Sequence, residues 1–164
     1  MKRNIFVTAL LLFFVGCTPQ QSGQLTQQQK DQIKSEVTAV VDSIFVRWAR
    51  LDVDRCFQCY WPELVVVFDS TRLDFEGYRK MCVEYIPLLT ATQWSKVRID
   101  VMPLTPDLAM CTAVWKSKDF LKSGDTETWN PVTYTLLLKK SEGQWKVTYS
   151  HASGIPVTEK AGKK

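Results

Sequence analysis

Residues 133–154, TYTLLLKKSEGQWKVTYSHASG, decide the fold. Two strand-length runs of aliphatic, threonine and aromatic residues, 132–139 and 145–151, flank the short polar segment 141–143. A short segment containing Gly between two such runs predicts a β-hairpin. Side chains alternate between the two faces of a strand. One face of the last strand is therefore expected to carry Trp145, Val147, Tyr149 and His151.

More strands are predicted upstream of this hairpin. The strand-length runs there are 64–68, 97–101 and 108–115. Val97, Ile99 and Val101 alternate with charged residues, which predicts that these three side chains share one face. Residues 116–131 are polar and contain a Gly and a Pro. They form either a long hairpin loop or extensions of the strands on either side.

A long helix is predicted near the start of the domain. Thr26 and Gln29 match the T-x-x-Q capping box, which satisfies free amides at a helix start. Apolar residues then recur at spacings of three and four, which is typical of an amphipathic helix. The predicted buried stripe consists of Ile33, Val37, Val40, Val41, Ile44, Trp48 and Leu51.

Two shorter helices are expected to follow. Asp52 or Asp54 can cap the second, which we expect to end at Trp61 because the residue before a proline is pushed out of the helical conformation. The third is predicted over residues 75–89, with Pro87 kinking it or ending it early and with an inward face made of Tyr78, Met81, Cys82 and Tyr85. Helices followed by strands predict an α+β domain, with three N-terminal helices packed on an antiparallel sheet.

The composition is that of an ordinary globular protein, with 164 residues, 45% hydrophobic and 23% charged. This excludes collagen-like, prion-like and wholly disordered chains. The formal net charge of +4 is not gathered into a basic patch, so nucleic acid is not an expected partner. We expect one domain over residues 30–158, followed by a charged tail at 159–164.

The first residues have the pattern of an export signal. Lys2 and Arg3 precede an apolar run, 5–15, that is too short to span a bilayer. Gly16 and Cys17 follow this run and resemble the lipobox of bacterial lipoproteins. The alternative is a plain signal peptide followed by an incidental Cys.

The lipobox resemblance implies a lipoprotein signal peptide at 1–16, with fatty acids such as palmitate attached through Cys17. The membrane is then a partner through the lipid anchor. Residues 17–29 are rich in Gln and are expected to form a flexible tether. Thr18, in place of Asp, resembles outer-membrane sorting signals, so the expected location is the bacterial cell envelope, at the outer membrane.

Two segments resemble the nuclear transport factor 2-like superfamily. Residues 49–73, ARLDVDRCFQCYWPELVVVFDSTRL, resemble its second helix and first strand, and residues 133–154 resemble its SnoaL-like branch. The resemblance covers about residues 30–156. It implies a curved sheet wrapped around helices into a cone, with a pocket inside and often a homodimer through the outer face of the sheet. The superfamily includes isomerases, cyclases, dehydratases and transport modules, so the fold does not decide the function.

The resemblance argues against ketosteroid-isomerase-like proton transfer. An ungapped alignment places Ile44 where that family has a catalytic Tyr and Phe68 where it has its base, and neither side chain exchanges a proton. We therefore expect a non-catalytic protein whose pocket binds a small ligand or which docks a protein partner. The alternative is a SnoaL-like acid/base enzyme of isomerase, cyclase or dehydratase type that uses a pocket His or Tyr.

His151 is the only His in the chain. If its face of the last strand is the inner one, it lies near the pocket mouth. There it can bind a polar group, act as a base or make a structural hydrogen bond. The candidate pocket residues are Tyr60, Tyr134, Tyr149 and His151. No catalytic residue, metal ligand or cofactor is assigned.

Four cysteines follow Cys17 and leave alternatives open: Cys56, Cys59, Cys82 and Cys111. Free Cys is often buried, so core thiols are one interpretation. An exported chain also meets an oxidising compartment, which permits disulfides. A C-x-x-C pair can indicate redox or metal chemistry, but no second pair or His stands at zinc spacing.

Overall fold

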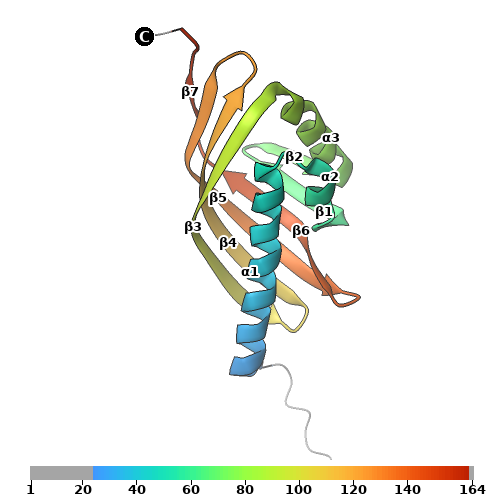
Figure 1. The fold of residues 1–164 in the computed structure, drawn as a ribbon. Helices are drawn as coiled ribbons and strands as arrows, with labels where there is room; N and C mark the ends of the chain where they lie inside the picture. The colour runs from blue at the N-terminus through green and yellow to red at the C-terminus, as the bar shows by residue number, and fades with distance from the viewer. Residues whose placement is uncertain (1–23, 163–164) are drawn as a thin grey trace, which may run out of the picture.

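The computed structural model describes residues 24–162, which form helices packed on one curved sheet (Figure 1). The predicted signal peptide and Cys17 lie outside the described residues. The helical elements are α1 (Gln27–Ala49), α2 (Val53–Phe57), α3 (Phe75–Tyr85) and the 3-10 turn η1 (Ile86–Leu88). The strands are β1 (Tyr60–Phe68), β2 (Thr71–Asp74), β3 (Leu89–Thr105), β4 (Leu108–Leu121), β5 (Thr126–Ser141), β6 (Gln144–Ser153) and β7 (Val157–Glu159).

The strands form a single seven-stranded sheet in the order β2-β1-β6-β5-β4-β3, and β7 pairs with β5. All pairs are antiparallel except β1 and β6, which run parallel. The sheet is therefore mixed, and the prediction of a wholly antiparallel sheet is wrong in this detail. A tight turn forces two strands to run antiparallel, but β1 and β6 are separated in sequence by helix α3 and four strands, so no turn fixes their relative direction.

Helix α1 crosses the concave face of the sheet, and α2 and α3 lie near one end of it (Figure 1). The capping box is confirmed, because Thr26 Oγ1 accepts from Gln29 N at 3.2 Å and the Gln29 side chain accepts from Thr26 N at 2.8 Å. Most of the predicted stripe is buried, but Val40 and Trp48 are only half-buried and Leu51 lies beyond the helix. The buried residues of α1 are Ile33, Val37, Val41, Ile44 and Phe45.

The two shorter helices end earlier than the sequence predicted. Asp52 caps α2, as expected, but α2 ends at Phe57 and not at Trp61. The reason is that Val147 N donates to Cys59 O at 2.9 Å, which draws the chain into the sheet at that point. Helix α3 ends before its predicted limit because Pro87 falls in the 3-10 turn that follows, as anticipated for a helix that proline ends early. No helix in the described part of the chain combines the length and apolar character needed to cross a bilayer.

Residues 116–131 turn out to be strand extensions rather than a loop. Strand β4 runs on to Leu121 and β5 begins at Thr126. Strand β7 then pairs with the start of β5, and Lys160 Nζ lies 3.0 Å from Asp125 Oδ2. The described part of the predicted charged tail is therefore held against this end of the sheet.

A bulge in β3 changes which residues face the core. Lys96 pairs with Trp115 and Arg98 pairs with Val114, so Val97 has no partner residue on β4. Val97 is 54% exposed, whereas Ile99 and Val101 pack against the core. The prediction that Val97 shares their face is wrong, because one extra residue in a strand reverses the alternation beyond it.

A second bulge, in β6, changes the interpretation of the last strand. Leu138 pairs with Val147 and Leu137 pairs with Tyr149, so Thr148 is the extra residue. Before it, Trp145 and Val147 are buried in the core, as predicted. After it, Ser150 and Ala152 take the inner face, and Tyr149 and His151 point to the outer one. The four residues predicted to share one face therefore divide between two.

Candidate functional site

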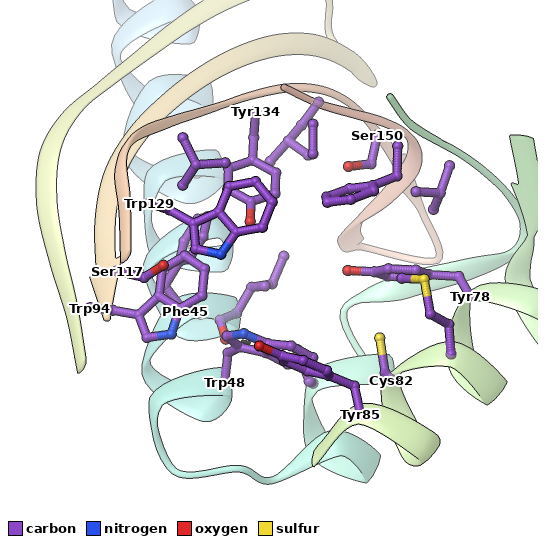
Figure 2. A pocket seen from close by; sticks show the side chains of 18 of the residues that line it. Phe45, Trp48, Tyr78, Cys82, Tyr85, Trp94, Ser117, Trp129, Tyr134 and Ser150 are labelled. Carbon is purple, nitrogen blue, oxygen red and sulfur yellow. Dashed lines mark hydrogen bonds between the residues drawn. The ribbon is translucent and has the colours of Figure 1, made fainter. Parts of the chain in front are cut away.

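A cavity of about 240 Å³ lies between the concave face of the sheet and helices α1, α2 and α3 (Figure 2). This is smaller than the roughly 300–1,000 Å³ of pockets for drug-sized ligands, so the cavity suits a small molecule. Its wall is largely aromatic. The aromatic residues that line it are Phe45, Trp48, Phe57, Tyr60, Phe68, Tyr78, Tyr85, Trp94, Trp129 and Tyr134.

Phe45 of α1 supports one side of this wall. Its ring stacks on Trp115 of β4 with centroids 4.1 Å apart, and its centroid is 5.3 Å from those of both Trp94 and Tyr134. Phe45 itself is buried. Aromatic contacts of this kind add roughly 0.5–1.5 kcal/mol each beyond burial, so this part of the wall is held in place by α1.

One end of the cavity carries two carboxylates around a single hydroxyl. Tyr85 Oη of α3 donates to Asp119 Oδ2 of β4 at 2.8 Å and lies 3.2 Å from Glu127 Oε2 of β5. Thr92 of β3 donates to the other oxygen of Asp119. Asp119 is only 4% exposed. Four elements therefore meet at this polar end, which consists of Asp119, Glu127, Tyr85 and Thr92.

Beside this polar end, two polar atoms of the cavity lining have no hydrogen-bond partner in the described chain. Ser117 Oγ and Trp94 Nε1 are buried and make no hydrogen bond within residues 24–162. Ser117 and Trp94 are paired residues on β4 and β3, so the two atoms belong to neighbouring positions of the wall. A buried polar group without a partner costs about 1–3 kcal/mol. An occupant of the cavity that hydrogen-bonds to them removes this cost.

Burial keeps the tyrosine hydroxyls of the cavity protonated. It raises the pKa of Tyr85 well above the usual value, and the negative charge of Asp119 raises it further. Burial is also the main cause of the raised pKa of Tyr60, Tyr78 and Tyr134. At neutral pH these side chains are therefore hydrogen-bond donors and acceptors and not tyrosinate bases.

The structure brings together only half of the predicted pocket residues. Tyr60 and Tyr134 line the cavity. Tyr149 and His151 do not, because the bulge at Thr148 turns them to the outer face of the sheet, where His151 pairs with residues of β1 and β5. The expectation that they lie at the pocket mouth is corrected accordingly. The predicted homodimer through this outer face stays a prediction.

The two positions that the resemblance equates with catalytic residues do lie at the cavity. Ile44 of α1 and Phe68 of β1 both contribute to its wall. Both side chains are hydrocarbon, so this part of the wall supplies apolar contact and no proton transfer.

The cysteines are buried free thiols in the described chain. Cys56 and Cys82 line the cavity, and Cys59 Sγ accepts a hydrogen bond from Arg47 Nη1 at 3.0 Å. Burial raises the pKa of Cys82 and of Cys111 to about 12. Within residues 24–162 no group of three or more His, Cys, Asp or Glu side chains could hold a metal ion.

Sequence reasoning missed the polar end of the cavity, although a signal for part of it was present. The inner face of β4 carries alternate residues from Ala109 without interruption, and all are buried: Ala109, Cys111, Ala113, Trp115, Ser117 and Asp119. Extending the alternation of the apolar run 108–115 into the polar segment would have placed Ser117 and Asp119 inside. Helical spacing correctly places Tyr85 on the inward side of α3, whereas Glu127 faces Asp119 across β4 and β5 in a segment that the sequence left open between loop and strand.

No protein-family model matches the chain, and no curated protein sequence matches it significantly. Crystal structures do match it. A proposed scytalone dehydratase from Novosphingobium aromaticivorans DSM 12444 is 11% identical, with a TM-score of 0.72 over 85% of this chain and 94% of that one. A hexachlorocyclohexane dehydrochlorinase, LinA-type3 from Novosphingobium barchaimii LL02, is 10% identical, with a TM-score of 0.71 over 84% of this chain and 96% of that one.

A third structure carries the superfamily name. An NTF2-like protein of unknown function from Pseudomonas putida KT2440 is 15% identical, with a TM-score of 0.65 over 75% of this chain and 87% of that one. Identities this low show the fold alone. The protein therefore has the nuclear transport factor 2-like cone fold, as the sequence resemblance predicted, with a cavity inside the cone.

Proposed function

We propose that this protein is a lipid-anchored protein of the bacterial cell envelope whose cavity binds a small, largely apolar ligand without transforming it. The observation that carries the binding proposal is the aromatic-lined cavity with two buried polar atoms, Ser117 Oγ and Trp94 Nε1, that have no partner in the described chain. Apolar walls with a few placed polar groups are typical of small-molecule sites.

The hydrogen bonding of the polar end supports binding rather than catalysis. Thr92 and Tyr85 each donate to one oxygen of Asp119, so both oxygens of this side chain already have a hydrogen-bond partner in the absence of a substrate. Ile44 and Phe68 place hydrocarbon where the ketosteroid-isomerase-like chemistry would need a Tyr and a base.

A second candidate function rests on the two carboxylates. Asp119 and Glu127 meet at one hydroxyl beside the cavity, and carboxylates in such positions serve as general acids and bases. Two of the fold neighbours are named as a dehydratase and a dehydrochlorinase. An acid/base enzyme of isomerase, cyclase or dehydratase type would then use these carboxylates with Tyr134, in place of the His151 expected from sequence.

A thermal-shift screen of the protein against a metabolite library tests binding. A ligand of the cavity should raise the melting temperature of the unaltered protein and fail to raise that of Ala152→Leu, which fills part of the cavity. Ser153→Leu places the same side chain at the next, exposed position of β6 and should leave the shift intact. A shift that survives Ala152→Leu would place the ligand elsewhere.

Incubation of each hit with the protein separates the two candidate functions. We expect the compound to be recovered chemically unchanged. Conversion that is lost in Asp119→Asn or Glu127→Gln, while the thermal shift remains, would make the protein an enzyme and overturn the non-catalytic proposal.

The lipid anchor is supported by the sequence pattern around Cys17 alone. Cys17→Ser should block acylation and leave the chain unprocessed or released from membranes. A variant that is cleaved before residue 17 and still partitions with membranes would contradict the anchor. That result would leave the cavity proposal untouched.

A further inference from the structure

We propose that the ligand of the cavity is a small organic cation, with a protonated amine on an apolar body, and that Asp119 and Glu127 are its counter-charges. This inference rests on the function proposed above, since it names the chemical class of the ligand that the same cavity binds.

The charge of the cavity lining favours a cationic ligand. Asp119 and Glu127 are the acidic residues of the wall, and no Lys, Arg or His of the described chain lines the cavity. Eight ion pairs occur among the described residues, and neither carboxylate takes part in one. Buried Asp and Glu are almost always paired. A cationic ligand supplies the missing positive charge, whereas an anion would be repelled by both groups.

The two carboxylates have too few hydrogen-bond donors around them. The Tyr85 hydroxyl has one proton, and Asp119 is the nearer of its two carboxylate neighbours, at 2.8 Å against 3.2 Å. When that proton goes to Asp119, Glu127 is left without a donor from the described side chains. Two carboxylates thus share the protons of two hydroxyls, Tyr85 and Thr92. An ammonium group offers up to three further donors at this point.

The aromatic wall of the cavity also favours a cation. Trp48, Trp94 and Trp129 surround the space beside Tyr85 in Figure 2. Trp rings attract a cation that lies within about 6 Å of the ring centre, and aromatic cages of this kind bind quaternary ammonium groups. Ser117 Oγ, on a residue only 4% exposed, adds an acceptor without a partner in the described chain. Negative charge and aromatic faces together favour a cation over a neutral ligand.

The test compares three probes that share one apolar body and differ in charge: phenylpropylamine, phenylpropanol and phenylpropanoate. They are titrated at pH 7 by calorimetry and by Trp fluorescence into the full chain carrying Cys17→Ser, which removes the acyl chains of the predicted anchor from the measurement. The amine should bind at least about tenfold more tightly than the alcohol, since one charged hydrogen bond contributes that much. The acid should bind most weakly.

Variants then assign the preference to the two carboxylates. Glu127→Gln keeps the shape of a half-buried side chain and should reduce the advantage of the amine over the alcohol several-fold. Glu142→Gln removes the same charge from the exposed hairpin turn between β5 and β6 and should leave the advantage intact. Asp119→Asn should abolish the advantage, and its melting curve shows whether the buried site still folds.

The outcomes separate this inference from the proposed function. If the alcohol binds as tightly as the amine, the cavity binds ligands and the cation proposal is wrong. If the advantage persists in both Glu127→Gln and a folded Asp119→Asn, the charge lies elsewhere and the proposal is also wrong. If none of the three probes binds but the thermal-shift screen yields a ligand whose shift is lost in Ala152→Leu, the cation proposal alone is wrong. If that screen also yields no ligand, the binding function is wrong as well.

Discussion

The indole Nε1 of Trp145 on β6 donates a hydrogen bond to Glu36 Oε2 on α1 at 2.7 Å. The same carboxylate oxygen lies 2.8 Å from Lys140 Nζ on β5, and Gln32 donates to the other oxygen at 2.9 Å. None of these residues lines the cavity. These contacts of Glu36 therefore hold α1 against the β5–β6 hairpin. They also fix the position of Phe45, on the same helix, at the cavity.

The hydrogen bonds around Glu36 predict that its contribution to the stability of the fold is lost in acid. The hydrogen bonds from Lys140, Gln32 and Trp145 lower the pKa of Glu36 from 4.5 to about 2. A carboxyl whose pKa is lowered on folding stabilises the folded state above its unfolded pKa, and that contribution is lost as the pH falls toward the folded value. The Glu36 side chain is 33% exposed, so solvent screening reduces its contribution to about 1 kcal/mol.

Urea unfolding of Glu36→Gln measures this contribution. We expect the variant to be less stable than the unaltered protein at pH 7, and the difference to shrink at about pH 2.5, where Glu36 is largely protonated in the unfolded chain. An equal difference at both pH values would show that the loss comes from packing and not from charge.

Trp145 itself should be among the most costly residues to truncate. It is 6% exposed and belongs to the main core. Trp145→Ala removes a buried indole together with its hydrogen bond and should lower the free energy of unfolding by about 3–5 kcal/mol. Trp145→Phe keeps an aromatic ring and should cost less. Equal stability of both variants and the unaltered protein in urea would contradict the position of β6 in the core.

His151 should be dispensable for binding. The bulge at Thr148 turns His151 to the outer face, where it pairs with Val67 and Thr135. His151→Gln should leave the affinity for a cavity ligand unchanged and alter stability by no more than about 0.5 kcal/mol. Ser150→Leu, one residue earlier and inward-facing, should weaken binding. Loss of binding in His151→Gln would restore the original pocket assignment.

The same two bulges mark the limit of what the sequence predicts. Alternation of apolar residues correctly located parts of β1, β3, β4, β5 and β6 and the inward position of Trp145, but it did not indicate β2 or β7. It failed beyond Val97 and Thr148, because a single inserted residue reverses the two faces and leaves no mark in the composition of the strand. The fold class follows from long, regular patterns, whereas the lining of the cavity depends on these single positions.

The polar end of the cavity shows a second limit. Ser117 and Asp119 continue an unbroken alternation and could have been placed from sequence. Glu127 lies opposite Asp119 on the neighbouring strand β5, but Tyr85 reaches both carboxylates from α3, which lies far away in the chain. Such a site exists only once the sheet has curved, so local pattern cannot predict it.

Buried cysteines should be inert in the folded protein. Burial raises the pKa of Cys82 and Cys111 to about 12, and it also raises that of Cys56. Because the thiolate is the reactive form, these three thiols should resist a maleimide at pH 7 until denaturant is added. Mass spectrometry of tryptic peptides gives the labelled sites. Rapid labelling of Cys111, or a disulfide found in the native protein, would contradict the buried free thiols seen here.

The hydrogen bond from Tyr85 to Asp119 allows a test of whether Asp119 and Glu127 interact through the Tyr85 hydroxyl. Tyr85→Phe keeps the ring but removes the hydroxyl that donates to Asp119 and lies beside Glu127. The variant should lose about 1–3 kcal/mol of stability, because buried Asp119 loses a donor and the hydroxyl between the two charges is gone. Tyr149→Phe, which removes a hydroxyl on the outer face of the sheet, should change little.

Adding Glu127→Gln to Tyr85→Phe should recover part of the loss. The substitution removes the second negative charge and supplies an amide that can donate to Asp119. Urea unfolding of Tyr85→Phe, Glu127→Gln and the double variant gives the coupling energy of the pair. We expect the double variant to lose clearly less stability than the two single variants lose in sum. The reason is that the Tyr85 hydroxyl offsets the repulsion between the two neighbouring carboxylates. If the stability changes of the two substitutions are strictly additive, Glu127 does not interact with Tyr85 and Asp119 in solution. The polar end would then hold one counter-charge rather than two.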